Sequence, residues 1–410
     1  MISFIHTADI HFGMENYGKI DSKTGIHSRL LDFEKALNFC IDFAIEKNVD
    51  FFLFAGDAYK TANPSPTQQK LLMQCLLKLY KANIPIIIIV GNHDNPLSFG
   101  KATALDVFGN LPVDGFYVIS KPASFVLQTK NGPVQIVGIP WPSRNNISLN
   151  NKFFLKSATE ITEYISNNVG ILIEQFAKEL DPKIPAVFTG HLTVSSGIFS
   201  GSEKRAIYGN DPVFLPSQLA IAPFDYVALG HLHRYQNLNL NGYPAIVYSG
   251  SIERVDFGER KEDKGFCFVK IHEKGNTTHE FVKTPVRPFI QIEAHLKPEI
   301  DHTQQLLEII KNYNINDAIV KILYFLPQNE KDSVNLRLVQ QACESAMFLV
   351  GIVPIRQIES RAKRTLMKID MNLEDLLNTY FQSKPELKNK KNDLIKKTLE
   401  IQQEIDELKE

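Results

Sequence analysis

Short apolar runs alternate with amphipathic stretches over residues 1–284 of this chain. Several of the runs are uninterrupted, such as FFLFAG at 51–56 and IIIIVG at 86–91. Continuous apolar runs of this length are typical of strands that are covered on both faces. We expect strands at Ser3–Ala8, Asp50–Ala55, Pro85–Val90, Val134–Gly138, Ala186–Thr189, Tyr226–Leu229 and Ala245–Ser249.

Apolar residues at three- and four-residue spacing lie between these runs and predict helices. Two sets show the spacing: Phe33, Leu37, Cys40, Ile41 and Ala44, and Leu71, Leu72, Cys75, Leu76 and Leu79. A longer helix is predicted over Thr159–Leu180, ending before a proline. Hairpin-like strands at Phe266–His272 and His279–Thr284 follow the alternating region. Together these elements predict a two-sheet α/β sandwich.

The pattern changes at Thr284–Pro288, where two prolines predict a domain boundary. Residues 289–360 then predict a small α+β domain with the order strand, helix, strand, helix, strand. Two helical segments follow, Leu373–Phe381 and Glu386–Glu410. In the second, an apolar residue recurs every seven positions and indicates helix–helix packing: Leu387, Leu394, Ile401 and Leu408. We therefore predict three parts, 1–284, 285–365 and 366–410, the last being a helical tail.

Five strings that end apolar runs carry side chains that bind metals. They are Asp9-Ile10-His11, Gly56-Asp57, Gly91-Asn92-His93-Asp94, Gly190-His191 and Gly230-His231-Leu232-His233. Ligands bind beyond the carboxyl ends of strands in open α/β sheets, so the five strings are expected to converge. One Asp-x-His or His-x-His pair alone is more often structural. The whole ordered set predicts a site for two adjacent divalent metals, an arrangement that suits hydrolysis of phosphate esters.

The types of ligand indicate which metals and which roles to expect. A mixture of carboxylate, carboxamide and imidazole suits Mn²⁺, Fe²⁺ or Zn²⁺ over Ca²⁺, and the lack of thiolates argues against a structural zinc site. Asp57 is central in the set and is predicted to bridge the two metals. His93 is predicted to act beside them, as a proton donor or positive charge, with Asp94 orienting its ring.

Composition and charge add few constraints. The chain has 410 residues, 44% of them hydrophobic, and a formal net charge of −1, so any affinity for DNA would come from local patches, metals or a partner. No charge-free apolar run approaches the roughly 18 residues of a membrane span. The start, MISFIHTADIHF, lacks the features of a secretory signal. The widely spaced Cys40, Cys75, Cys267 and Cys343 predict buried reduced thiols, and a cytoplasmic location is expected.

The motif strings are similar to those of the calcineurin-like binuclear metallophosphoesterases. TADIHFG, FAGD, VGNHD, TGHLTVSSG, LGHLHRYQ and YSGSIERVDFGERKEDKGF together resemble the SbcD family, the nuclease component of the SbcCD double-strand-break repair complex, over residues 1–270. The last string distinguishes this family from other phosphoesterases. The resemblance makes His93 the catalytic histidine. It implies one metal on Asp9, His11, Asp57 and His233, and a second on Asp57, Asn92, His191 and His231.

The same resemblance implies a cofactor and partners. Mn²⁺ is the usual activating metal of the family, DNA is the substrate, and an SMC-like ATPase of the SbcC type is the partner. The nuclease component is expected as a homodimer within a heterotetramer. Phe289–Glu359 corresponds to a DNA-capping domain, and the helical tail to a segment that docks on the partner's coiled coil. The implied function is a Mn²⁺-dependent exonuclease and endonuclease that acts on DNA double-strand ends and hairpins.

Lys60 departs from the family pattern, which commonly has His or Asp three residues after the aspartate of the GD string. The metal ligands are unaffected, so the expected consequence concerns the positioning of DNA and the balance of exonuclease and endonuclease activity. Lys60, Arg29 and Arg254 are candidate contacts to DNA phosphates, with surface roles as the alternative. The basic group Arg356, Arg361, Lys363 and Arg364 is either a DNA-tracking patch or a solvated face.

Two other functions stay open on the sequence alone. A binuclear phosphoesterase that acts on a small molecule or a phosphoprotein would not need the domain after Pro288 for its activity. A non-enzymatic scaffold with a decayed metal site is the second alternative, and the complete set of ligands argues against it.

Overall fold

The computed structural model describes residues 1–96, 101–142, 157–201, 211–298, 300–327, 330–356, 377–378, 380–381, 387 and 390–407. The predicted basic residues Arg361, Lys363 and Arg364, the heptad position Leu408 and most of the predicted helix Leu373–Phe381 lie outside these residues. The chain forms two compact units. The first comprises Met1–Ile292, Tyr313–Lys321 and Gln340–Gly351, and the second comprises the described residues of Glu293–Asn312, Ile322–Val339 and Ile352–Glu410.

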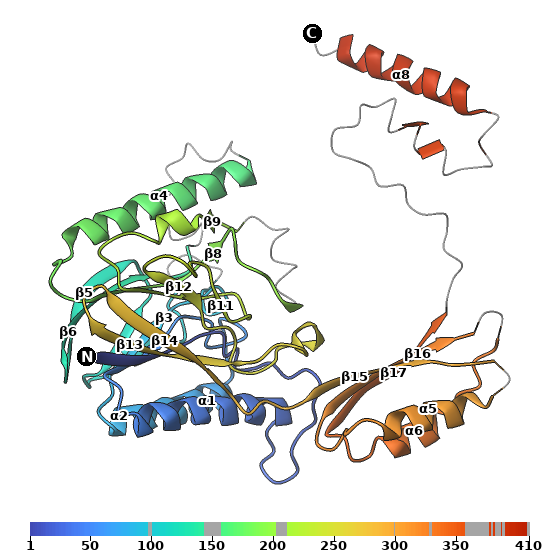
Figure 1. The fold of residues 1–410 in the computed structure, drawn as a ribbon, viewed down its shortest axis with the longest axis horizontal. Coiled ribbons are helices and arrows are strands. Elements are labelled where there is room, and N and C mark those ends of the chain that lie inside the picture. The colour runs from blue at the N-terminus through green and yellow to red at the C-terminus, as the bar shows by residue number, and fades with distance from the viewer. Residues whose placement is uncertain are drawn as a thin grey trace. The chain divides into compact units, whose positions relative to one another are not determined.

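Two six-stranded sheets form the centre of the first unit, within its described residues (Figure 1). The order in the first sheet is β14 (Asn276–Lys283), β13 (Gly265–Glu273), β1 (Ile2–Thr7), β2 (Phe51–Phe54), β3 (Ile86–Ile89) and β4 (Phe116–Ile119). The order in the second is β11 (Gln236–Asn237), β12 (Ala245–Tyr248), β10 (Tyr226–Gly230), β7 (Ala186–His191), β6 (Gly132–Ile139) and β5 (Ala123–Thr129). Strands β8 (Thr193–Val194) and β9 (Val213–Phe214) form a separate short pair. The predicted two-sheet α/β sandwich is confirmed.

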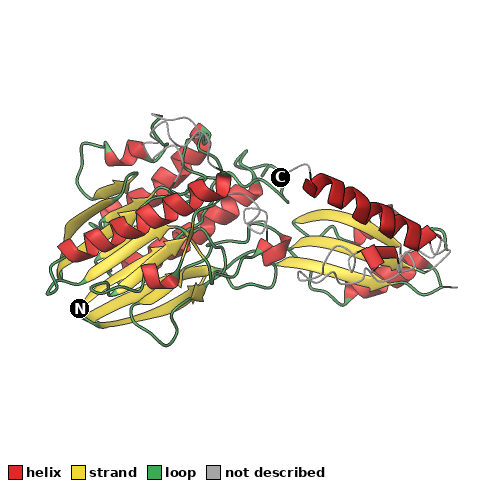
Figure 2. Ribbon diagram, turned by 90° about the horizontal axis from the view of Figure 1, so that it is seen from above, coloured by secondary structure: helices red, strands yellow, loops and turns green. Residues whose placement is uncertain are grey.

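Helices cover the outer faces of the two sheets (Figures 1 and 2). Helices α1 (Ser28–Glu46) and α2 (Pro66–Lys81) pack on the first sheet, and α4 (Ala158–Glu179) packs on the second. The short helix α3 (Asp106–Gly109) lies beside β4. Local sequence fixes where two of these helices begin, because Ser65 with Gln68 and Ser157 with Glu160 form capping boxes that satisfy first-turn N–H groups.

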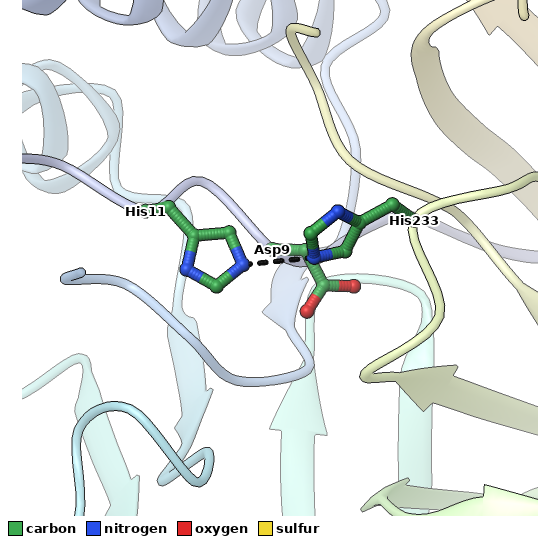
Figure 3. Close-up of side chains that lie close together, drawn as sticks. All are labelled: Asp9, His11 and His233. Carbon is green, nitrogen blue, oxygen red and sulfur yellow. Dashed lines mark hydrogen bonds between the residues drawn. The ribbon is translucent and has the colours of Figure 1, made fainter. Parts of the chain in front are cut away.

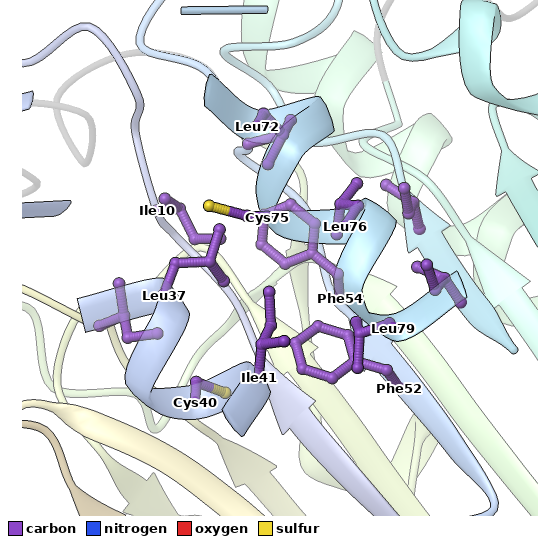
Figure 4. Close-up of a cluster of buried hydrophobic side chains, with 14 of the residues drawn as sticks. Ile10, Leu37, Cys40, Ile41, Phe52, Phe54, Leu72, Cys75, Leu76 and Leu79 are labelled. Atoms are coloured by element: carbon purple, nitrogen blue, oxygen red, sulfur yellow. The ribbon is translucent and has the colours of Figure 1, made fainter. Parts of the chain in front are cut away.

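Side chains of the central strands are buried on both faces, which explains the uninterrupted apolar runs. In β2, Phe51 and Leu53 point between the two sheets, where they join Phe4 and Tyr226. The alternate residues Phe52 and Phe54 point toward α1 and α2 (Figure 4). Successive side chains of a strand face opposite sides, so a strand between two layers needs apolar residues at every position. The sheets therefore form the inner layers of an α/β/β/α sandwich.

The sequence pattern did not predict β4 and β5. Strand β5 lies at the end of its sheet order, next to β6, and its residues alternate between exposed and more buried positions. Ser124, Val126 and Gln128 are exposed, whereas Leu127 is buried. This half-exposed edge strand has no continuous apolar run. Strand β4 has four residues and its first three are partly exposed, so it gives an equally weak signal.

A three-stranded sheet has the order β15 (Phe289–His295), β16 (Ile319–Leu326), β17 (Phe348–Arg356). Helices α5 (His302–Lys311) and α6 (Leu336–Ala342) connect the strands, so the order of elements is the predicted one. The last described helix is α8 (Lys391–Glu407). Among the described residues, none of the helices is both long enough and apolar enough to span a membrane.

Candidate metal centre

Five parallel strands from the two sheets end at the site. Asp9 and His11 follow β1, Asp57 follows β2, and Asn92 follows β3. The second sheet contributes His191, the last residue of β7, and two histidines directly after β10, His231 and His233. Strands β1, β2 and β3 pair in parallel, as do β7 and β10, so their carboxyl ends meet at one edge. The structure therefore brings together the seven side chains that the sequence predicted as ligands.

The backbone at the site adopts an unusual conformation. The φ angles are 54° at Asp9, 51° at His11, 58° at Asp57 and 105° at His231. Left-handed backbone is uncommon for residues other than glycine, and strain of this kind is concentrated at functional sites. Hydrogen bonds hold the turns, since the N–H of Asp9 donates to the Gly56 carbonyl and that of His11 to the Asp57 carbonyl, both at 3.0 Å. The turns after β1 and β2 thus fix each other.

One group of ligands consists of Asp9, His11 and His233 (Figure 3). One donor atom from each lies within 4.8 Å of the others. The Nε2 atoms of His11 and His233 face each other at 3.0 Å. The carboxylate of Asp9 also accepts the N–H of His231 at 3.1 Å, which ties it to the turn after β10.

Asp57 lies between this group and a second one. Its Oδ2 is 3.7 Å from Nε2 of His11 and 3.4 Å from Nε2 of His191. In the second group, Oδ1 of Asn92 is 3.0 Å from Nε2 of His191 and 3.2 Å from Nδ1 of His231. Two clusters of donor atoms therefore share one carboxylate, which is the arrangement expected of two adjacent metals.

Two glycines allow this close packing. A Cβ on Gly91 would lie 2.2 Å from Oδ1 of Asp57, and a Cβ on Gly56 would lie 2.3 Å from Nδ1 of His191. Gly56 also has a φ of 98°. Any other residue at either position would displace a ligand, so both glycines are required by space, and Gly56 is required by its conformation as well.

The electrostatics of the site suit metal binding. Burial lowers the pKa of His11 well below its usual value and that of His231 to about 3. Burial also opposes a charged His191, but the Asp57 carboxylate outweighs it and raises the pKa of His191 to about 9. Buried Nδ1 of His11 and Nε2 of His231 have no hydrogen-bond partner within the described part of the chain. Neutral imidazoles and ionised carboxylates are the forms that bind cations, so His11 and His231 are ready to bind, and a metal beside Asp57 would displace the proton of His191.

His93 lies beside the ligands, but its ring is oriented by a different group from the one expected. Its backbone N–H donates to Oδ1 of Asp57 at 2.9 Å, and its Nδ1 donates to the carbonyl of Lys60 at 2.9 Å. Asp94 is buried, and its carboxylate accepts N–H groups of Ala58, Tyr59 and Gly91 at 2.9–3.2 Å. The expected role of Asp94 in orienting the ring of His93 is therefore corrected: this carboxylate holds the turns after β2 and β3.

Arg29 is fully buried and has a structural environment. Its guanidinium donates to Oδ2 of Asp32 at 2.7 Å and to the carbonyl of Arg254 at 2.5 Å, and lies 3.8 Å from Oε1 of Glu253. The guanidinium of Arg254 donates to the carbonyls of Arg287 and Glu262. The expected phosphate contact of Arg29 is therefore corrected, because its guanidinium is buried on protein partners. Arg254 is partly exposed, and its contact to phosphate stays a prediction. Lys60 is partly exposed.

Sequence reasoning missed three residues at the site. Glu259 accepts Nδ1–H of His233 at 2.7 Å, and Lys264 lies 2.9 Å from the other oxygen of Glu259. Both residues belong to the string at 250–265, which distinguishes the SbcD family in the sequence. The string is a signal that this segment matters, but it assigns no role to Glu259 or to Lys264. Trp141, the sole tryptophan of the chain, has its ring 4.9 Å from that of His231, and no pattern in the sequence indicated this.

Comparisons with known proteins indicate a family for this chain. A family model described as calcineurin-like phosphoesterase matches residues 2–235. The chain is similar to the SbcD component of the nuclease SbcCD from Staphylococcus saprophyticus, with 30% identity over 311 residues and 75% of each chain covered. It is also similar to "DNA double-strand break repair protein Mre11" of Methanococcus maripaludis, with 25% identity over 97% of this chain and 95% of that one. A solved dimetal phosphatase from Danio rerio aligns with a TM-score of 0.42 and 9% identity, covering 68% of this chain and 98% of that chain.

Proposed function

The chain belongs to the calcineurin-like phosphoesterase family, in the branch of the SbcD nucleases, and from this premise we propose that it is a Mn²⁺-dependent DNA nuclease. Family membership makes it a phosphodiester hydrolase. Two similar proteins support DNA as the substrate, because one is named a nuclease and the other a DNA double-strand break repair protein. The observation that carries the proposal is the convergence of seven metal-binding side chains in two groups, with the carboxylate of Asp57 between the groups.

The seven side chains divide into two sets in this proposal. Asp9, His11 and His233 hold one metal, Asn92, His191 and His231 hold the other, and Asp57 lies between them. Two bound divalent metals would lower the pKa of water toward neutrality and neutralise charge on the phosphate. The chain's own contribution is a fixed and buried ligand geometry, held by turns that bond to each other.

His93 is the proposed proton donor or positive charge beside the phosphate. Because its Nδ1–H is bonded to the Lys60 carbonyl, Nε2 is the atom available to the substrate. Burial lowers the pKa of His93. An anionic phosphodiester nearby raises the pKa of an imidazole again, so the arrival of substrate favours the protonated ring. General acid–base help of this kind is worth about 10²–10⁴-fold in rate.

The other parts of the chain complete the proposal. Residues 1–284 are the nuclease domain, 285–365 cap the DNA, and the tail at 366–410 binds an SbcC-type ATPase, within a heterotetramer built on a nuclease homodimer. On α8, Leu394 and Ile401 are 37% and 46% exposed. Large exposed apolar residues at heptad spacing on one helix support docking on a coiled coil.

A cleavage assay on linear duplex DNA with Mn²⁺ tests the proposal. We expect the wild type to degrade the DNA and His93→Gln to be slower by about 10²–10⁴-fold, with Mn²⁺ binding retained because Gln replaces no proposed ligand. His272→Gln is a matched control, since His272 is an exposed histidine bonded to Thr278. Unchanged cleavage by His93→Gln would contradict the role of His93. Hydrolysis of a small phosphomonoester without cleavage of DNA would contradict DNA as the substrate.

A further inference from the structure

The string at 250–265 places two buried and oppositely charged side chains behind one ligand of the metal centre. Glu259 and Lys264 are 0% and 1% exposed. The Nζ of Lys264 is 2.9 Å from Oε2 of Glu259, and it also donates to the backbone carbonyl of His233 at 2.9 Å. Lys264 therefore contacts both the carboxylate of Glu259 and the main chain of His233, whose ring that carboxylate holds.

Each oxygen of Glu259 has a separate partner. Oε1 accepts Nδ1–H of His233 at 2.7 Å, and Oε2 accepts the N–H of Val255 at 2.8 Å as well as Lys264. A carboxylate bound at both ends keeps a single orientation. The ring of His233 is consequently fixed as the tautomer with Nδ1 protonated, and its Nε2 faces His11 (Figure 3).

The ligands of the second group are held differently. Nδ1 of His191 donates to the backbone carbonyl of Ala55 at 2.8 Å, and Nε2 of His231, the ring nitrogen that does not face Asn92, has no hydrogen-bond partner within the described residues. A carboxylate behind a ligating histidine increases the basicity of that ring, and a neutral carbonyl does so less. The two groups of ligands thus differ in the charge that lies behind their histidines.

We propose that Glu259 and Lys264 are positioning residues that strengthen metal binding at the position formed by Asp9, His11 and His233 with the shared Asp57, and leave the position formed by Asn92, His191 and His231 with the same Asp57 unaffected. This inference rests on the two-metal site of the proposed function. Glu259 orients His233 and increases the basicity of its ring. Lys264 pairs with the Glu259 carboxylate and ties down the His233 backbone. Partners of this kind typically change metal affinity by about 10–100-fold.

Two readouts follow the two positions separately. Calorimetric titration with Mn²⁺ measures both binding equilibria. Quenching of Trp141 fluorescence by the same ion reports mainly the second position, because the indole ring lies 4.9 Å from His231 and 6.1 Å from His191. In Glu259→Gln, we expect one calorimetric equilibrium to weaken by about 10–100-fold, whereas the quenching curve keeps the wild-type midpoint.

Glu262→Gln is the matched control. The carboxylate of Glu262 lies 3.2 Å from the same Nζ of Lys264, so the control removes a negative charge from the same lysine without touching His233. We expect wild-type binding at both positions in this variant. Lys264→Met should weaken the same equilibrium as Glu259→Gln. If the buried methionine prevents folding, the nearly isosteric Glu259→Gln decides the question.

Two results would overturn the inference. One is wild-type affinity at both positions in Glu259→Gln. The other is equal weakening of both positions together with a lower metal-free unfolding temperature, which would make the pair a structural element only. Neither readout depends on DNA cleavage. A wild type that binds two Mn²⁺ ions without cutting DNA would contradict the proposed substrate and leave the inference standing.

Discussion

The first unit contains two clusters of buried charge that differ in how their members are paired. In the metal centre, Nε2 atoms of His11 and His233 face each other at 3.0 Å, and Nε2 of His231 has no partner within the described residues. We call the other set the arginine cluster: Arg29, Asp32, Glu253 and Arg287. There, both oxygens of Asp32 meet guanidinium groups at 2.6–2.8 Å.

The difference shows that burial alone does not identify a functional site. Asp9 and Arg29 are both 0% exposed. In the arginine cluster, charges of opposite sign compensate one another, and Glu253 also accepts the N–H groups of Arg254 and Arg287. In the metal centre, several lone pairs converge on one space. Converging acceptors require a cation, whereas a network of paired opposite charges requires no bound ion.

The largest effect should follow from removing the carboxylate that the two ligand groups share. We expect Asp57→Asn to slow DNA hydrolysis by about 10³-fold, because metal stabilisation of the transition state is worth several kcal/mol. Steady-state kinetics with Mn²⁺ would measure the loss. The same variant should lose most of the stabilisation that Mn²⁺ gives to the folded protein, which is about 2.7 kcal/mol at a concentration 100-fold above the dissociation constant.

Thermal unfolding with and without Mn²⁺ gives the control for this variant. A folded metal-free Asp57→Asn protein without the Mn²⁺-dependent rise in unfolding temperature would agree with a binding role. A full rise would show that Asp57 is dispensable for metal binding and would remove the contrast between the two clusters.

The second effect concerns the arginine cluster and should appear in stability. Arg29→Met leaves Asp32 and Glu253 buried with less compensation, and breaking a buried pair typically costs about 3–5 kcal/mol. Urea unfolding would measure this cost. Activity per folded molecule should stay at the wild-type level, because Arg29 contacts none of the proposed ligands in the described residues.

An exposed ion pair supplies the comparison for Arg29. Lys78 pairs with Asp42 at 3.1 Å, and the two side chains are 44% and 63% exposed. Lys78→Met should change the free energy of unfolding by less than about 1 kcal/mol. If Arg29→Met were as mild as Lys78→Met, the arginine cluster would not be the structural element described above.

The contrast between the clusters also shows what the sequence could predict. The metal ligands follow apolar strands directly, so local pattern and the rule for carboxyl ends of strands were sufficient to find them. The environment of Arg29 depends on Glu253 and on Arg254, and Arg254 lies 225 residues away in the chain. The sequence around Arg29 shows only a basic residue near the start of a helix. Glu259 is likewise 26 residues from His233. The sequence identifies a functional residue when its role follows from its place in one strand or helix. The roles of Arg29 and Glu259 depend on contacts between distant elements, which the sequence does not show.

The smallest effect should come from Lys60, whose side chain lines a cavity of about 480 Å³ with Asn16, Tyr17 and Phe257. Its carbonyl holds the ring of His93, so Lys60→Ala keeps that hydrogen bond and removes only the ammonium group. If the ammonium contacts one DNA phosphate, the slope of log affinity against log salt should fall by about one. Arg29→Met should leave the slope unchanged, because the guanidinium of Arg29 is buried on protein partners.

Equal slopes for Lys60→Ala and the wild type would make Lys60 a solvated residue. A change of slope with Arg29→Met would show that the arginine cluster also acts on DNA binding.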